Sequence, residues 1–189
     1  IGVRLVGSEM CIRDRRYSLK LPVVAANMDT VSEKEMCIAM SEIGAAAILH
    51  RFMSVEEQVE QVKAVAKSGA SFVAASVGVA EDAKQRAKQV VDAGAQVLTV
   101  DIAHGHSESM IQMIRWLKNE FKDVDVIGGN VATPQATLDL IEAGADAVKV
   151  GIGPGSMCTN RVMTGVGFPQ LSAVAACAEV GRKEGVPVI

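Results

Sequence analysis

Short apolar runs alternate with longer amphipathic stretches along almost the whole chain. The apolar runs predict strands, because a short continuous apolar stretch is typical of a strand covered on both faces. The amphipathic stretches have the periodicity of helices with one buried side. We therefore expect strands at 22–27, 46–50, 71–78, 96–103, 125–130, 147–153 and 186–189. We expect helices at 32–43, 55–68, 80–93, 107–121, 134–143 and 170–183.

The strict alternation of strand and helix restricts the fold class. Continuous apolar strands indicate a parallel sheet, and the alternation leaves either a doubly wound sheet or a TIM barrel. Polar residues follow the apolar part of most strands, among them Asn27, His50, Asp101 and Asn130. Catalytic groups gather at that end of the strands in TIM barrels. We therefore favour an α/β fold of the TIM (β/α)8 barrel type, incomplete, with about seven strands present.

Two of the predicted helices begin with a capping-box pattern. Ser32 and Ser54 each precede a helical stretch, and a glutamate follows three residues later at Glu35 and Glu57. A serine in this position accepts a hydrogen bond from a free backbone N–H, and the glutamate returns one. We expect both serines to be N-caps.

Composition and charge exclude several classes of protein. A chain of 189 residues suits one domain, and 49% hydrophobic residues with only 3% aromatics predict an aliphatic core. The net charge of −3 provides no basic surface for nucleic acid, and no apolar run reaches the roughly 18 residues that cross a bilayer. The four cysteines form no CxxC pair, which argues against zinc and disulfides and for a cytoplasmic setting. The four are Cys11, Cys37, Cys158 and Cys177.

The segment from Lys149 to Gln170, KVGIGPGSMCTNRVMTGVGFPQ, carries the strongest chemical signal. Its glycines allow a backbone to approach a ligand closely, and Cys158 follows them at the end of a strand. A cysteine in such a loop is a candidate nucleophile, whereas Cys37 and Cys177 fall on apolar helix faces and are expected to be inert. A Rossmann fingerprint is disfavoured, since the third glycine comes one residue too early.

From residue 17 to 189 the sequence resembles the family of IMP dehydrogenases and GMP reductases. Four segments carry the resemblance: LPVVAANMDTV (21–31), VDIAHGHS (100–107), VIGGNVAT (126–133) and the cysteine loop. The resemblance implies a TIM barrel, a purine nucleotide substrate, a nicotinamide cofactor and a full-length protein that is a homotetramer.

Two activities remain open within this family. Many of its dehydrogenases carry CBS domains between the second helix and the next strand, whereas residues 66–71 join these elements directly here. This absence, and the run TGVGFPQLSAV (164–174), favour a GMP reductase that deaminates GMP to IMP with NADPH. VIGGNVAT and AHGHS are shared with dehydrogenases, so oxidation of IMP to XMP with NAD is the alternative. A third alternative is a barrel that binds a nucleotide without turning it over.

The resemblance also assigns roles within the cysteine loop. Cys158 is the expected nucleophile, forming a covalent thioimidate with C2 of the purine. The family has threonine two positions after the cysteine, where this chain has Asn160, so Thr159 is the candidate for the acid–base role. Backbone carbonyls of Gly153, Gly155 and Cys158 match ligands of a potassium ion.

Further binding residues follow from the other matching segments. Ser156 matches a residue that contacts the nucleotide phosphate, and Met28 and Asn130 match residues lining the purine pocket. Asp101 matches the aspartate that faces the nicotinamide ribose of the cofactor. The histidines show no metal-ligand spacing and are interpreted as structural or pocket-rim residues.

The two ends of the chain carry expectations of their own. Residues 1–15 contain VGSEMCIRDR, which does not match the family, and we interpret them as a non-native leader. Residues 16–189 are then a partial catalytic domain without CBS insertion. The family continues beyond the sequence VPVI with ribose- and phosphate-binding loops and a catalytic glutamate, so this segment alone is expected to be inactive.

Overall fold

The computed structural model of this chain describes residues 10–11 and 17–189. Within them a six-stranded parallel sheet has the order β3-β4-β5-β6-β7-β8. Its strands are β3 Val24–Ala25, β4 Ala46–Leu49, β5 Ala74–Val77, β6 Val97–Asp101, β7 Asp125–Val131 and β8 Ala147–Val150. The helices are α1 Lys34–Glu42, α2 Val55–Lys67, α3 Ala83–Asp92, α4 Glu108–Glu120, α5 Pro134–Glu142, α6 Thr159–Thr164 and α7 Gln170–Glu184.

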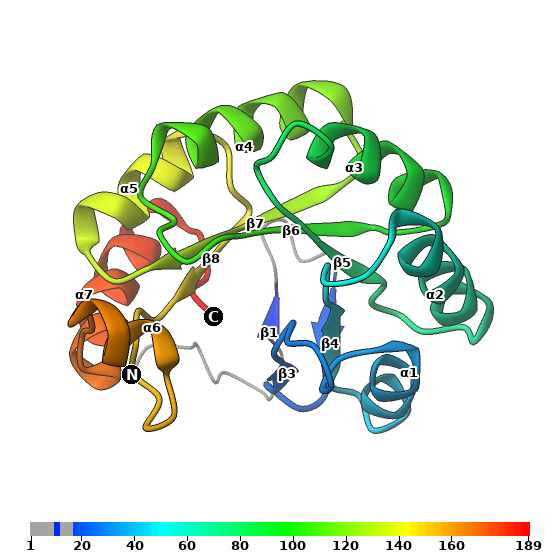
Figure 1. Cartoon of the computed structure of the whole chain (residues 1–189), viewed down its shortest axis with the longest axis horizontal. Coiled ribbons are helices and arrows are strands. Elements are labelled where there is room, and N and C mark those ends of the chain that lie inside the picture. The colour runs from blue at the N-terminus through cyan, green and yellow to red at the C-terminus, as the bar shows by residue number, and fades with distance from the viewer. Residues whose placement is uncertain (1–9, 12–16) are drawn as a thin grey trace.

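The sheet is curled, and the helices α1 to α5 and α7 lie along its outer side (Figure 1). A doubly wound sheet would have helices on both faces, so the expectation of an incomplete TIM barrel is confirmed. The predicted strand at 186–189 is present as a single parallel bridge between Val148 and Val188. Ile189 adds a hydrogen bond from its N–H to the Val148 carbonyl at 2.9 Å.

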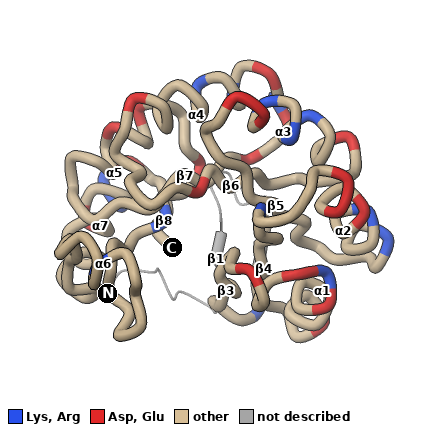
Figure 2. Tube along the Cα trace, in the orientation of Figure 1, with Lys and Arg blue, Asp and Glu red and all other residues tan. Residues whose placement is uncertain are grey.

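The curled sheet with its outer helices forms the wall of the barrel, and two apolar layers stabilise it. On the outer face, Leu98 of β6 and Ile114 of α4 are fully buried between sheet and helices. On the inner face, Ile48, Val97 and Ile127 form a second cluster. Charged residues lie mainly along the outer helices, while the strands are largely uncharged (Figure 2). Burial of both faces explains why the strands are continuous apolar runs.

The two predicted capping boxes have opposite outcomes. Ser54 accepts a hydrogen bond from the Glu57 N–H at 3.1 Å, and the Glu57 carboxylate accepts one from the Ser54 N–H at 2.9 Å, so this prediction is confirmed. The prediction for Ser32 was wrong, because α1 begins after Glu33 and has no side-chain cap. Ser32 is buried in a tight turn, where its hydroxyl donates to the Ala26 carbonyl instead.

Several local features differ from the sequence pattern. The strand expected at 22–27 is only the two-residue β3, and α6 was not predicted. A short antiparallel pair joins β1, Met10–Cys11, to β2, Ser18–Leu19. The interpretation of residues 1–15 as a leader falls, apart from 10–11, outside the described residues. Among the helices of the described residues, none has the length and apolar character needed to cross a membrane.

Candidate active site at the carboxyl ends of the strands

The loop that follows β8 is closed at its neck. The Phe168 N–H donates to the Ile152 carbonyl at 2.8 Å, and the Gln170 side chain donates to the Val150 carbonyl at 2.9 Å. Gly153 has a φ of +62°, and a Cβ added there would lie 2.8 Å from the Val166 carbonyl oxygen. Glycine is therefore required where the two sides of the neck approach each other.

Cys158 lies inside this closed loop and is half-buried. Its N–H donates to the Gly155 carbonyl at 3.2 Å, and α6 begins at the next residue. Cys37 and Cys177 are buried, and burial raises the pKa of both thiols, that of Cys37 to about 12. Of the three cysteines whose side chains the structure describes, Cys158 is the one that lies at the strand-end face with its sulfur outside the core.

The neighbours of Cys158 are exposed. Ser156, Thr159 and Asn160 all lie on the solvent side of the loop. The Asn160 carbonyl accepts a hydrogen bond from the Thr164 hydroxyl at 2.7 Å, inside the short helix. Thr159 is the first residue of α6 and directly follows the cysteine. The position of Thr159 is compatible with the acid–base role expected for it, which stays a prediction.

Two of the three carbonyls expected to bind potassium, those of Gly155 and Cys158, are already hydrogen-bonded. Gly155 accepts from the guanidinium of Arg161 at 3.0 Å as well as from the Cys158 N–H. The Cys158 carbonyl accepts from the Val162 N–H at 3.2 Å. Backbone oxygens are suitable ligands for a hard cation. The Arg161 charge occupies one of them, so the loop in this arrangement does not fit the ion.

A polar cluster lies at the ends of β6, β7 and β8. Asp101, Gly129 and Lys149 are register partners across the three strands. Because Gly129 has no side chain, Lys149 reaches across it, and its Nζ lies 3.9 Å from Asp101 Oδ1. Burial lowers the pKa of Lys149, and the Asp101 carboxylate opposes that shift. Sequence analysis missed Lys149, although a lysine within an apolar strand was a usable signal.

Asn130 connects this cluster to the cysteine loop. Its side-chain Nδ2 donates to the Gly151 carbonyl at 3.0 Å, and its Oδ1 accepts from Lys149 Nζ at 3.3 Å. Gly151 is the residue at which the loop leaves the sheet. The structure therefore brings Asp101, Asn130 and the root of the cysteine loop together.

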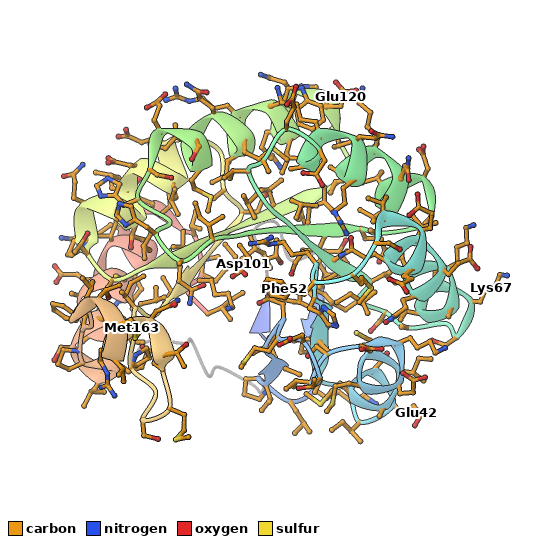
Figure 3. All side chains as sticks on the ribbon, viewed as in Figure 1. Glu42, Phe52, Lys67, Asp101, Glu120 and Met163 are labelled. Atoms are coloured by element: carbon orange, nitrogen blue, oxygen red, sulfur yellow. The ribbon has the colours of Figure 1, made fainter. Side chains whose placement is uncertain are left out.

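The remaining candidate, Met28, comes from the other side of the curled sheet. It follows β3 and is 58% exposed. Because all six strands are parallel, the segment after β3 and the loop after β8 lie at the same end of the barrel. Asp101 lies toward the inside of the curl, whereas Lys67 and Glu120 lie on its outer rim (Figure 3).

Two of the histidines, His106 and His50, contact polar groups of the chain. His106 Nε2 lies 2.7 Å from Asp139 Oδ2 on the exposed rim. His50 is buried, and its Nδ1 accepts from the Phe52 N–H at 3.1 Å. Within residues 10–11 and 17–189, no group of three or more His, Cys, Asp or Glu side chains is arranged to hold a metal ion.

Comparison with known proteins finds one family. Residues 7–189 match the model of the IMP dehydrogenase / GMP reductase domain. An inosine-5'-monophosphate dehydrogenase of Cryptosporidium parvum is 36% identical over 217 residues, covering 93% of this chain and 54% of the relative. The enzyme of the same name from Nitrosopumilus maritimus is 53% identical over 123 residues, covering 65% of this chain and 26% of the relative. One from Staphylococcus aureus is 50% identical over 121 residues, covering 64% of this chain and 25% of the relative. The chain thus spans about half, or less, of the length of these relatives.

Proposed function

This chain belongs to the IMP dehydrogenase / GMP reductase family, and from this premise we propose that it carries out a nicotinamide-dependent oxidation or reduction at C2 of a purine nucleotide. The observation that supports the proposal most directly is the placement of Cys158. The residue is half-buried on a closed loop beyond β8, at the same end of the sheet as Asp101 and Asn130. A nucleophile and its binding groups at this end are typical of a TIM-barrel active site.

Oxidation of IMP to XMP with NAD is the direction that we place first. The curated relatives described above are named inosine-5'-monophosphate dehydrogenase. Reduction of GMP to IMP with NADPH is the second candidate. It is favoured by the direct connection between α2 and β5, where residues 68–73 leave no room for an inserted domain, and by the run at 164–174.

Cys158 is proposed to be the nucleophile in both reactions, the oxidation of IMP and the reduction of GMP. Its sulfur bonds to purine C2, and a covalent thioimidate results. From IMP, the thioimidate forms when the C2 hydrogen of the sulfur adduct leaves as hydride, for which a bound nicotinamide would be the acceptor, and water then replaces the sulfur to give XMP. From GMP, ammonia leaves, hydride arrives at C2, and the sulfur departs to give IMP. Thr159 is the proposed proton carrier, and Asn160 has no such role, because an amide does not relay a proton as a hydroxyl does.

The other residues bind and orient. Ser156, exposed beside the cysteine, is proposed to contact the nucleotide phosphate. Met28 and Asn130 are proposed to line the purine pocket. The carboxylate of Asp101, whose side chain is 20% exposed, suits the paired hydroxyls of a ribose. A nicotinamide dinucleotide bound there supplies the hydride acceptor or donor.

Three broader properties belong to the same proposal. The complete protein is proposed to be a cytoplasmic homotetramer, as the family resemblance implies. A potassium ion at Gly153, Gly155 and Cys158 would require Arg161 to leave the Gly155 carbonyl, and we therefore assign no step of the reaction to it.

A chlorinated nucleotide tests the covalent step without any cofactor. In 2-chloroinosine 5'-monophosphate, attack of the Cys158 sulfur on C2 forms the S–C2 bond and releases chloride. We expect mass spectrometry of the digested chain to locate the adduct on the Cys158 peptide and to find none in Cys158→Ser. Adducts on Cys37 or Cys177 instead, or no adduct at all, would contradict the proposed nucleophile.

Two assays then separate the candidate activities. NADH formation from IMP and NAD indicates the dehydrogenase, and ammonia release from GMP and NADPH indicates the reductase. Both assays are run beside Cys158→Ser as the control. Both are measured on the complete protein, because the segment alone is expected to be inactive; an adduct at Cys158 without turnover of the complete protein would favour the nucleotide-binding barrel that does not catalyse.

A further inference from the structure

The cysteine loop, residues 151–170, contains a single charged side chain, that of Arg161. Arg161 is also the one charged residue in the sequence between Lys149 and Glu179. Most large apolar side chains of the loop are exposed, so apolar burial contributes little to its closed shape. Polar contacts must therefore hold the loop, and Arg161 makes several of them.

The aliphatic stem of Arg161 passes between two glycines at the neck of the loop. A Cβ added at Gly153 would lie 3.1 Å from Arg161 Cβ, and one added at Gly167 would lie 2.8 Å from Arg161 Cδ. Gly153 has a positive φ, whereas Gly167 does not. At Gly167 the space needed by the arginine stem, rather than the backbone conformation, therefore explains the absence of a side chain.

The polar groups of Arg161 hold both ends of the segment that carries Cys158. Its Nη2 donates to the Gly155 carbonyl at 3.0 Å, before the cysteine. Its own carbonyl accepts from the Gly165 N–H at 2.8 Å, after the cysteine. The Gly155 carbonyl also accepts from the Cys158 N–H at 3.2 Å, so the guanidinium and the cysteine backbone share one acceptor. A displaced guanidinium would thus release the group to which Cys158 is bonded.

No acid cancels the charge of Arg161. Within residues 10–11 and 17–189, no carboxylate oxygen lies within 4.0 Å of its guanidinium. A guanidinium and a monovalent metal ion each carry one positive charge, and carbonyl oxygens bind both. The Arg161 guanidinium therefore occupies, at the Gly155 carbonyl, a position at which the family resemblance led us to expect potassium.

We propose that Arg161 is a positioning residue that holds the cysteine loop in place of a bound cation and so orients Cys158 toward the purine. The proposal rests on the proposed function, because it takes Cys158 as the nucleophile. Arg161 acts through the Gly155 carbonyl and does not touch the reacting atoms. The order of the loop is then independent of added potassium as long as Arg161 is present.

Two alkylating reagents test the positioning role on the complete protein. Saturating 2-chloroinosine 5'-monophosphate labels a sulfur oriented toward the bound purine, whereas iodoacetamide labels any accessible thiolate. In Arg161→Met, which keeps a stem but has no donor, nucleotide labelling of Cys158 should fall about tenfold, because a charge-assisted hydrogen bond is lost. Labelling of Cys158 by iodoacetamide should not fall, and Cys37 should stay protected, which separates a displaced loop from an unfolded protein.

Three further variants make the labelling test specific. Gly167→Ala keeps the charge but displaces the arginine stem, and should reproduce the loss. Arg161→Lys keeps a charged N–H donor and should label faster than Arg161→Met. Arg182→Met removes an equal charge from an exposed position on α7 and should label normally. Normal nucleotide labelling in Arg161→Met, no gain in Arg161→Lys, or an equal loss in Arg182→Met would each overturn the proposal.

Hydrogen exchange of the peptide 151–168 tests the replacement of the ion without any nucleotide. It is measured by mass spectrometry in choline chloride and in potassium chloride of equal concentration. Potassium should leave the exchange of the unmodified protein unchanged and should slow it in Arg161→Met, where the Gly155 carbonyl is open to the ion. Slower exchange of the unmodified protein in potassium, or no effect of potassium on the variant, would overturn the proposal.

The two kinds of measurement keep the proposals separate. Labelling of Cys158 that does not depend on Arg161 would overturn the positioning role alone. Hydrogen exchange that depends on Arg161, in a protein whose Cys158 the nucleotide never labels, would overturn the catalytic assignment and leave the contact between Arg161 and Gly155 in place.

Discussion

The wall of the barrel and the cysteine loop are built on opposite principles. In the wall, strands β4 to β8 are almost wholly buried between two apolar layers. In the loop, large apolar side chains face solvent, with Met157 88%, Val162 73% and Met163 82% exposed. Apolar burial holds the wall in place, whereas hydrogen bonds at its neck hold the loop. The candidate nucleophile therefore lies on a segment that contributes little to the folding free energy.

The largest expected difference between the two regions is in cysteine reactivity. With a pKa of about 12, the Cys37 thiol at about pH 8 is ionised in only roughly one molecule in 10⁴, and it is also buried. We expect iodoacetamide to modify Cys158 about a thousandfold faster than Cys37, as followed by peptide mass mapping. In denaturant the two rates should converge. Equal rates in the folded chain would show that Cys158 is as protected as the core.

Truncation of side chains should give the next largest contrast. Leu98→Ala removes a fully buried side chain from β6 and should lower the free energy of unfolding by about 3 kcal/mol. Met163→Ala, in the loop, should lower it by less than about 0.5 kcal/mol. Urea unfolding measures both. A comparable loss in Met163→Ala would mean that the loop contributes to the core after all.

The buried side-chain amide of Gln58 connects α2 to the carboxyl-terminal parts of β4 and β5. Gln58 is fully buried and donates to the carbonyls of His50 and Ser76 at 3.0 and 2.9 Å. Gln58→Leu should cost about 2 kcal/mol of unfolding free energy in urea, because two buried carbonyls lose their donor. Gln112→Leu, on an exposed face of α4, is the matched control and should stay within about 0.5 kcal/mol. Equal stability of the two variants would contradict the structural role of Gln58.

The smallest effect is expected at the exposed rim, from the pH dependence of stability. The hydrogen bond from His106, with a further one from Gln135, lowers the pKa of Asp139 in the folded chain. The carboxylate therefore stabilises the fold above its ordinary pKa of about 4, and this contribution is lost as the pH falls through the lowered value.

Asp139→Asn should accordingly cost about 0.5 kcal/mol in urea unfolding near pH 6 and nothing at strongly acid pH. Asp92→Asn, at the exposed end of α3, serves as the control. If the loss of unfolding free energy in Asp139→Asn became larger at lower pH, the lowered pKa of Asp139 could not be its cause.

Features encoded locally were predictable from the sequence. The alternation of apolar and amphipathic stretches predicted the parallel sheet, and Ser54 with Glu57 gave the correct cap, because both signals depend on neighbours in the chain. Ser32 has the same local pattern but was assigned wrongly. Its hydroxyl is used by a turn whose geometry depends on the packing of β3 and α1.

Features that need several elements were not predictable. The contact between Lys149 and Asp101 exists because β7 places Gly129, which has no side chain, between them. The cavity of about 180 Å³ lined by Arg51, Arg86 and Ile102 joins segments after three different strands, and the intervening sequence carries no sign of it. Cys158 was identifiable from its glycine-rich surroundings, because the loop that carries it is continuous in sequence.

Two hydrogen bonds to the backbone of Gly151 restrict how the cysteine loop can move. Asn130 holds the Gly151 carbonyl, and β7 holds the Gly151 N–H through the Val131 carbonyl at 2.8 Å. Any swing of the segment bearing the thiol must therefore pivot beyond this anchor. Such a swing would displace the sulfur while the carboxylate at the end of β6 keeps its place.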